Sequence, residues 1–246
     1  MTDTPFAVLA DIHGNALALK AVLADIRASG ITRIVNLGDV FSGPMDPAGV
    51  WDQLEPLDLL TVRGNHDRAL VDYAPEEMWD TDRLTHTLLP QAAFDWIRTL
   101  PTEARLEDVY LCHATPDQDD LYWTEIVADG TLRLAPLDHI APLAEGVSES
   151  LILYGHTHVP RTIRLADGRL LVNPGSVGCP GYSDDRDPAH IMQTGTPLAS
   201  YAVIARQGTG WRVDHRQIPY DWDAAAAQAR AHGREDWAKV VSTGWM

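Results

Sequence analysis

The stretch FAVLADIHGN, residues 6–15, runs from an apolar segment directly into Asp11 and His13. Residues 6–10 are compatible with a buried strand, so the two polar side chains follow the end of that strand. If the backbone stays extended there, alternate side chains point to the same side. Asp11 and His13 would then share one metal ion, although such a triplet also arises by chance and His13 could be an ordinary loop residue.

Strands and helices alternate through the first part of the chain. Residues 33–37 and 59–62 are predicted strands, and the apolar spacing of residues 15–29 predicts a helix that ends before Gly30. A short helix through Trp51 is predicted after two prolines. This βαβαβ order indicates a parallel sheet.

The later segments change in character. Residues 68–102 have a mostly helical pattern, and residues 109–112 and 151–154 are predicted strands. Short strands separated by turn residues follow, which indicates an antiparallel half, and an alanine-rich helix comes near the end. We expect one domain over residues 1–246, with residues 68–102 as a helical insertion or cap and residues 199–246 as a C-terminal hairpin and helix.

The net charge of the chain restricts the classes of molecule that it can bind. The formal net charge is −16 over 246 residues, which disfavours a long nucleic acid, because such binding normally needs a basic patch. Bound divalent cations would reverse the local charge, so a small anionic substrate remains compatible. No apolar run approaches the ~20 residues that cross a bilayer, and no signal peptide precedes the first strand. We therefore expect a cytoplasmic protein without a membrane partner, and the sequence carries no signal for an oligomeric state.

The cysteine content is low. Cys112 and Cys179 are too few for a disulfide framework, which favours reduced thiols. Cys112, which precedes His113, is either an inward-facing strand residue or a soft metal ligand.

Further polar stretches also follow predicted strands. They are Gly38-Asp39, Gly64-Asn65-His66-Asp67, His113 and Gly155-His156-Thr157-His158. Taken singly, each has an ordinary interpretation as a turn, a cap or a loop residue. Together with the first stretch they place carboxylates and imidazoles beyond the carboxyl ends of the strands, where open α/β sheets bind their ligands. The joint pattern predicts two metal ions.

In its order DxH, GD, GNH(D/E), H and GHxH, this pattern resembles the calcineurin-like metallophosphoesterase superfamily. The loop at residues 173–178, Asn-Pro-Gly-Ser-Val-Gly, is similar to that of the branch with small bacterial phosphodiesterases and diadenosine-polyphosphatase-like proteins. The resemblance implies an α/β fold, namely a four-layer α/β/β/α sandwich of two mixed β-sheets flanked by helices.

The resemblance also implies the two ligand sets. One ion would be held by Asp11, His13, Asp39 and His158, and the other by Asp39, Asn65, His113 and His156, so that Asp39 would bridge them. The resemblance favours Mn²⁺, while mixed imidazole and carboxylate ligands also suit Fe²⁺, Zn²⁺, Co²⁺ or Ni²⁺. Two such ions ~3.5–4 Å apart can lower the pKa of a bridging water, and the hydroxide would attack the phosphorus atom.

The catalytic residues expected beside the ions are Asp39 and His66. His66 resembles the family histidine that contacts the phosphoryl oxygen or protonates the leaving group, and its alternative role is to orient Asn65. Asp67 would orient His66 or cap the following helix. Residues 40–43 are Val-Phe-Ser-Gly, whereas the protein serine/threonine phosphatases continue with Asp-Arg-Gly. The absent arginine argues against a phosphoprotein phosphatase.

Substrate contacts are expected from aromatic and basic residues. Trp123 is the candidate for a pocket wall, and Arg68 or Arg161 could replace the absent arginine, although surface roles are their ordinary interpretation. The predicted function is hydrolysis of a small phosphorylated substrate, namely a phosphodiester, a nucleotide or a dinucleoside polyphosphate. The competing functions are those of a phosphomonoesterase, a hydrolase of non-phosphate substrates, and a catalytically silent metal-binding scaffold.

Overall fold

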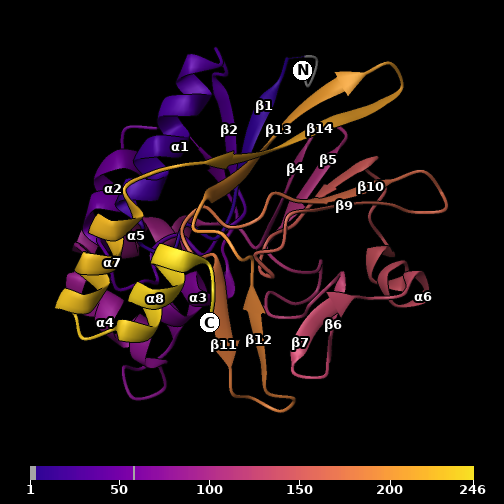
Figure 1. The fold of residues 1–246 in the computed structure, drawn as a ribbon. Helices are drawn as coiled ribbons and strands as arrows, with labels where there is room; N and C mark the ends of the chain where they lie inside the picture. Colours follow the sequence, from indigo (N-terminus) through magenta and orange to yellow (C-terminus); the bar gives the residue numbers. More distant parts are fainter. Residues whose placement is uncertain (1–3, 58) are drawn as a thin grey trace.

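The computed structural model describes residues 4–57 and 59–246, and over these residues the chain forms three β-sheets flanked by helices (Figure 1). The first sheet has the strand order β14-β13-β1-β2-β3. Its strands are β1 (Phe6–Leu9), β2 (Arg33–Asn36), β3 (Leu60–Thr61), β13 (Ala199–Gln207) and β14 (Gly210–Ile218). As predicted, β1, β2 and β3 are parallel, whereas β13 and β14 add an antiparallel edge.

The second sheet has the order β4-β5-β8-β10-β9. Its strands are β4 (Glu103–Leu106), β5 (Val109–Cys112), β8 (Leu151–Leu153), β9 (Arg161–Arg164) and β10 (Leu170–Asn173). Parallel pairs at β5-β8 and β8-β10 lie between antiparallel edges, so this sheet is also mixed. The expected division into a parallel first half and an antiparallel second half is therefore replaced by two sheets that each draw strands from both halves.

Three apolar clusters define the layers. Between the two sheets, residues such as Val8 and Leu37 pack against Leu111 and Leu153. The outer face of the first sheet packs on α1 (Ala16–Ala28), α2 (Pro47–Leu54) and α5 (Gln91–Thr99). The outer face of the second sheet packs on α6 (Leu137–Ile140) and the 3-10 turn Pro142–Ala144. The predicted four-layer α/β/β/α sandwich is confirmed.

The helix after the first strand follows directly from its sequence. Asn15 caps α1, because its side chain accepts a hydrogen bond from the backbone N–H of Ala18. Leu19, Val22 and Ile26 repeat at helical spacing and are fully buried against the first sheet. This packing fixes the loop between β1 and α1, which carries Asp11 and His13.

A third sheet was not predicted. It has the order β11-β12-β7-β6, and its strands are β6 (Glu125–Ala128), β7 (Thr131–Leu134), β11 (Gly181–Asp184) and β12 (His190–Gln193). These strands are short and carry polar residues, so they lack the apolar run that marked the strands of the other sheets. The third sheet lies below the sandwich in Figure 1, with β11 beside α8 (Glu235–Thr243).

The helices other than α6 gather on one side of the molecule (Figure 1). Within the segment expected to be helical, the structure has part of α3 (Asn65–Asp72) and the whole of α4 (Asp80–Leu88) and α5. After the β13-β14 hairpin the chain forms α7 (Trp222–Ala231), which Asp221 caps, and then α8. The sequence analysis predicted a single helix here and missed α8, which begins after the linker His232-Gly233-Arg234.

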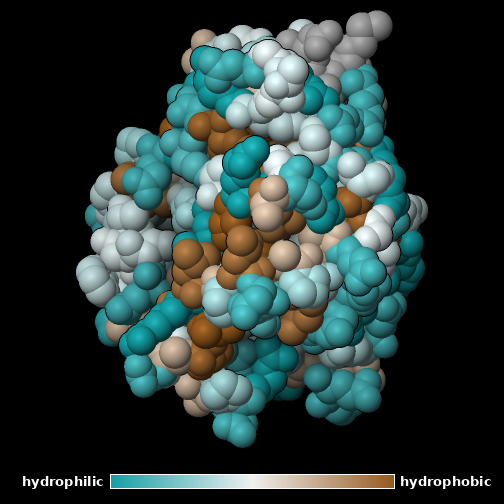
Figure 2. Space-filling model, turned by 90° about the vertical axis from the view of Figure 1, so that its right-hand side faces the viewer, coloured by the Kyte–Doolittle hydropathy of each residue, from teal (hydrophilic) through white to brown (hydrophobic). Residues whose placement is uncertain are grey.

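The surface on the right-hand side of Figure 1 is partly apolar. Figure 2 shows apolar side chains gathered across the middle of this face. The exposed large apolar residues of β6, β7 and α6 are Ile126, Leu134 and Leu137. None of the helices in the described part of the chain has the length and apolar character needed to cross a membrane.

Candidate metal centre

Two groups of metal-ligating side chains lie at the carboxyl ends of the strands. Asp11, His13 and His158 form the first group, and Asp39, His113 and His156 form the second. Within each group, one ligand atom from every residue lies within 4.8 Å of the others, and the six residues come from the loops that follow four strands, namely β1, β2, β5 and β8. The resemblance implied that Asp39 would belong to both sites, and in the structure it groups with His113 and His156.

The backbone reaches this arrangement through left-handed conformations. Asp11, His13, Asp39, His156 and His158 have φ angles of 54°, 48°, 54°, 68° and 58°. The expectation of an extended backbone is therefore wrong, and sharp turns bring the side chains together. A non-glycine residue in this region costs about 1–3 kcal/mol and persists where its surroundings hold it.

Neighbouring loops hold those turns. The backbone N–H of Asp11 donates to the carbonyl of Gly38 at 3.0 Å, and that of His13 donates to the carbonyl of Asp39 at 3.0 Å. The loop predicted at residues 173–178 also contributes, since the Ser176 hydroxyl donates to the carbonyl of Asp11. The first two loops are thus locked to each other.

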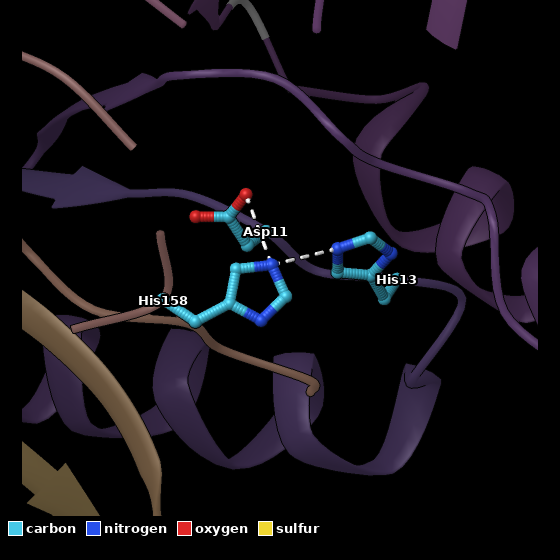
Figure 3. A group of neighbouring side chains, drawn as sticks. All are labelled: Asp11, His13 and His158. Carbon is cyan, nitrogen blue, oxygen red and sulfur yellow. Dashed lines mark hydrogen bonds and ion pairs between the residues drawn. The ribbon is translucent and has the colours of Figure 1, made fainter. Parts of the chain in front are cut away.

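The first group presents lone pairs to a common point (Figure 3). The Nδ1 atoms of His13 and His158 lie 2.7 Å and 2.8 Å from the carbonyl oxygens of Ser42 and Cys179. A carbonyl only accepts, so each Nδ1 carries the proton and each Nε2 has a lone pair. The two Nε2 atoms are 3.1 Å apart, and His158 Nε2 is 3.5 Å from Asp11 Oδ1.

A bound cation would offset the repulsion between these acceptor atoms. Burial lowers the pKa of His13 to about 4 and holds that of His158 well below its usual value, so a second proton on either ring is disfavoured. Burial also raises the pKa of Asp11 to about 8. Two facing lone pairs beside a buried carboxylate fit a divalent metal ion.

The second group is arranged around Asp39. Its Oδ1 accepts the backbone N–H of His66 at 2.9 Å, while its Oδ2 lies 3.2 Å from His113 Nε2 and 3.9 Å from His13 Nε2. His113 Nδ1 donates to the carbonyl of Leu37 at 2.6 Å. Asp39 Oδ2 therefore lies between the two groups, as a bridging ligand would.

Asn65 and His156 complete this site. Asn65 Oδ1 is 3.1 Å from His113 Nε2. Burial lowers the pKa of His113, but Asp39 and Asp11 outweigh it and raise the pKa to about 10. A proton on Nε2 would satisfy the nearby oxygens, and a bound metal ion would take the place of that proton.

Two buried acceptor atoms also indicate that this site binds cations. Among the residues that the structure describes, Asp11 Oδ2 and His156 Nε2 are buried without a hydrogen-bond partner. Burial lowers the pKa of His156 to about 3, so its Nε2 is a lone pair. Unpaired buried acceptors are costly unless a cation binds them.

His66 is held by a residue that the sequence did not indicate. His66 Nδ1 lies 2.8 Å from Oδ1 of Asp82, a fully buried residue of α4 that also accepts the hydroxyl of Ser42. Burial lowers the pKa of His66, but Asp82 and Asp39 raise it to about 9. Asp82 belongs to no motif, and an acidic residue in the first turn of a helix is ordinarily exposed.

Asp67 has the capping role rather than the orienting role. Its carboxylate accepts the backbone N–H groups of Asp39 at 2.8 Å, Val40 at 3.0 Å and Gly64 at 3.1 Å. It makes a capping box at the start of α3 and fastens the loop of Asp39 to that helix.

The residues that the sequence suggested as substrate contacts do not line the cleft beside the metal centre. Trp123 is fully buried against the second sheet, and its Nε1 donates to the carbonyl of Ile140 at 3.1 Å, so the prediction of a pocket wall is wrong for this residue. Arg68 pairs with Asp119 through Nε at 2.6 Å and Nη2 at 3.0 Å.

Arg161 and Cys112 also lie outside the site. Arg161 pairs with the buried Glu125 at 2.6 Å. Neither Arg161 nor Arg68 lines the cleft beside the metal centre. Cys112 is buried in β5 and belongs to neither ligand group, as expected for an inward-facing strand cysteine.

A cleft of about 270 Å³ opens beside the two ligand groups. His66 lines it together with four aromatic residues, namely Trp79, Tyr122, Tyr182 and Trp237. Tyr122 occupies the place that the sequence had suggested for its neighbour Trp123. Trp237 is in α8, a helix that the sequence analysis missed.

Residues 5–196 match the calcineurin-like phosphoesterase superfamily domain, and the chain belongs to this superfamily. The uncharacterized protein MJ0912 of Methanocaldococcus jannaschii is 28% identical over 244 residues, which cover 90% of each chain. A crystal structure of a metallophosphoesterase from Sphaerobacter thermophilus aligns with a TM-score of 0.75 at 22% identity, over 98% of this chain and 99% of that one. A proposed diadenosine tetraphosphatase aligns with a TM-score of 0.53 at 17% identity, over 88% and 95% of the two chains. These structures share the fold.

Proposed function

We propose that this protein is a phosphoesterase that uses two divalent metal ions to hydrolyse a phosphodiester or a nucleotide. The observation that carries the proposal is the position of Asp39 Oδ2 between two groups of buried ligands. Asp11, His13 and His158 would hold one ion with Asp39, and Asn65, His113 and His156 would hold the other with Asp39. We propose Mn²⁺ as the metal, because the ligands are imidazole nitrogens and hard oxygens.

When bound, the two ions would neutralise the phosphoryl oxygens and lower the pKa of the attacking water. The chain's own contribution is to hold the ligands in place. Ser42, Leu37 and Cys179 accept the Nδ1 protons of three histidines, so each of those rings is fixed with Nε2 toward the site.

His66 supplies the proton in this proposal. Asp82 fixes the ring through Nδ1, and the ring lines the cleft 5.4 Å from that of His13, measured between centroids. Nε2 is then available to donate a proton to the leaving oxygen of the substrate. No serine or cysteine nucleophile is required.

The test is turnover of bis-p-nitrophenyl phosphate and p-nitrophenyl phosphate by metal-stripped protein, before and after Mn²⁺ is restored. We expect turnover of the diester to require metal and to fall by at least about 100-fold in Asp39→Asn, because that change weakens both sites. Asp138→Asn, an exposed residue of α6, is the matched control. Metal-independent turnover, or full activity in Asp39→Asn, would contradict the proposal. Metal binding without turnover of either ester would favour a catalytically silent scaffold.

A further inference from the structure

Each of four histidines at the metal centre lies against an aromatic residue that lines the cleft. The ring-centroid distances are 5.1 Å for His66 and Trp79, 5.9 Å for His13 and Trp237, 5.1 Å for His156 and Tyr122, and 5.0 Å for His158 and Tyr182. Aromatic walls therefore begin directly at the place where a phosphoryl group would bind.

The two tryptophans are linked through ring contacts with His66 and His13. The centroids of His66 and His13 are 5.4 Å apart, with Trp79 next to His66 and Trp237 next to His13. Trp79 is 43% exposed and lines the cleft, so part of its ring is accessible to a ligand there. Trp237 is half-buried in α8 and lies beyond the segment that matches the superfamily.

Hydrogen bonds hold the two tyrosines of the cleft, Tyr122 and Tyr182, in fixed positions. Tyr182 donates its hydroxyl proton to the Tyr122 hydroxyl at 2.9 Å, and Tyr122 lies 2.8 Å from Nε2 of His190. Since the Nδ1 of His190 is bonded to the carbonyl of Pro188, that Nε2 accepts the Tyr122 proton. A fixed wall of this kind selects ligands by shape.

The charges of the cleft restrict the phosphate content of a substrate. The two arginines that line it are both paired, Arg186 with Asp184 at 2.6 Å and Arg234 with Asp236 at 2.7 Å. Asp80 and Asp185 line it as well, so the part of the cleft outside the ligand groups has more acidic than basic residues. A single phosphate at the metal centre is accommodated, whereas further phosphates would meet like charges.

We propose that Trp79 and Trp237 determine specificity for a substrate with one phosphate ester and one planar aromatic group, such as a nucleobase, and that polyphosphate chains are disfavoured. This inference rests on the proposed phosphoesterase activity. The aromatic group packs against the indoles while the phosphoryl group lies at the metal centre. The cleft volume of about 270 Å³ is at the small end for ligand sites, which suits one aromatic group rather than two nucleosides.

The experiment compares two diesters with the same leaving group, thymidine 5′-methyl phosphate and dimethyl phosphate, by the release of methanol on the Mn²⁺-loaded protein. We expect a KM about tenfold lower for the thymidine ester, as one stacked base would give. Trp79→Ala and Trp237→Ala should each reduce this preference severalfold, while Trp79→Phe and Trp237→Phe should keep most of it. Trp222→Ala, in the adjacent helix α7 and outside the cleft, is the matched control.

A second measurement separates this inference from the proposed activity. Thymidine monophosphate should quench tryptophan fluorescence of the Mn²⁺-loaded wild type, with binding weakened about tenfold in Trp237→Ala and unchanged in Trp222→Ala. If no ester is turned over but this binding pattern holds, the activity fails and the aromatic site stands. Equal KM values for the two esters in wild type, or faster turnover of diadenosine tetraphosphate than of the thymidine ester, would overturn the inference.

Discussion

Replacing Asp82 with asparagine isolates the role of the His66-Asp82 pair. The substitution keeps the size of the side chain and an oxygen that can accept from Ser42 or His66, but it removes the negative charge. Asp82 is fully buried and belongs to neither of the two ligand groups, so the metal sites should be unaffected. The expected consequence is a loss in the chemical step alone.

The size of that loss follows from the contact. A hydrogen bond to a charged group contributes about 1.5–3 kcal/mol, and each 1.4 kcal/mol is a factor of about ten in rate. If His66 needs the Asp82 carboxylate to hold its ring and its proton, kcat should fall by about 10- to 150-fold. KM should change by less than about threefold, since Asp82 does not line the cleft.

The assay is steady-state hydrolysis of bis-p-nitrophenyl phosphate, with the metal content of each sample measured in parallel. Asp95→Asn, an exposed residue of α5, is the control and should behave as wild type. Thermal unfolding is recorded for both variants, because a folding defect in Asp82→Asn would lower activity without bearing on His66. An unchanged kcat in a folded, fully metal-loaded Asp82→Asn protein would refute the assignment of His66 as the proton donor positioned by Asp82.

Three further predictions concern the rest of the site and the fold. A chelator should remove diesterase activity, and Mn²⁺ should restore it; activity that survives complete metal removal would contradict the two-metal proposal. Gly43→Ala should lower the free energy of unfolding by about 3 kcal/mol or more and weaken metal binding, because the added Cβ would lie 1.8 Å from the carbonyl oxygen of His13. Gly210→Ala is the control and should have little effect, since its nearest contact would be at 3.9 Å. Hydrogen bonds from Tyr201 and Arg216 lower the pKa of Asp25 below its usual value of 3.8. The ionised carboxylate therefore stabilises the folded state above pH 3.8, and this stabilisation is lost as the pH falls through the lower pKa of the folded state. The stability difference between wild type and Asp25→Asn in urea should thus be constant from about pH 8 to 5 and shrink below about pH 4, and a difference that grows on acidification would contradict this sign.

The metal ligands were accessible from the sequence because each motif is local. Asp11 and His13, or His156 and His158, are two residues apart and follow an apolar strand, so short patterns carry the information. The ordering of these strands in parallel pairs then brings the motifs to the same end of the sandwich. The local geometry was not accessible, since the left-handed turns depend on hydrogen bonds between loops that are far apart in sequence.

The residues around the ligands were largely missed, and the reason is physical. Asp82 and Trp237 lie at the site because α4 and α8 pack beside it, and neither helix contains a sequence motif from which this packing could be predicted. Trp123 was preferred to Tyr122 as a pocket wall, but the structure buries Trp123 against the second sheet, and Tyr122 lines the cleft. Choosing between these two residues required the direction of one side chain, which the sequence does not encode locally.

The central claim is that two metal ions act together at this site. The most direct measurement titrates metal-stripped protein with Mn²⁺ and follows hydrolysis of bis-p-nitrophenyl phosphate as a function of metal equivalents per chain. Because Asp39 Oδ2 lies between two complete ligand groups, activity should be low up to one equivalent and should reach its plateau at two. A plateau at a single equivalent, or activity in the stripped protein, would contradict the account.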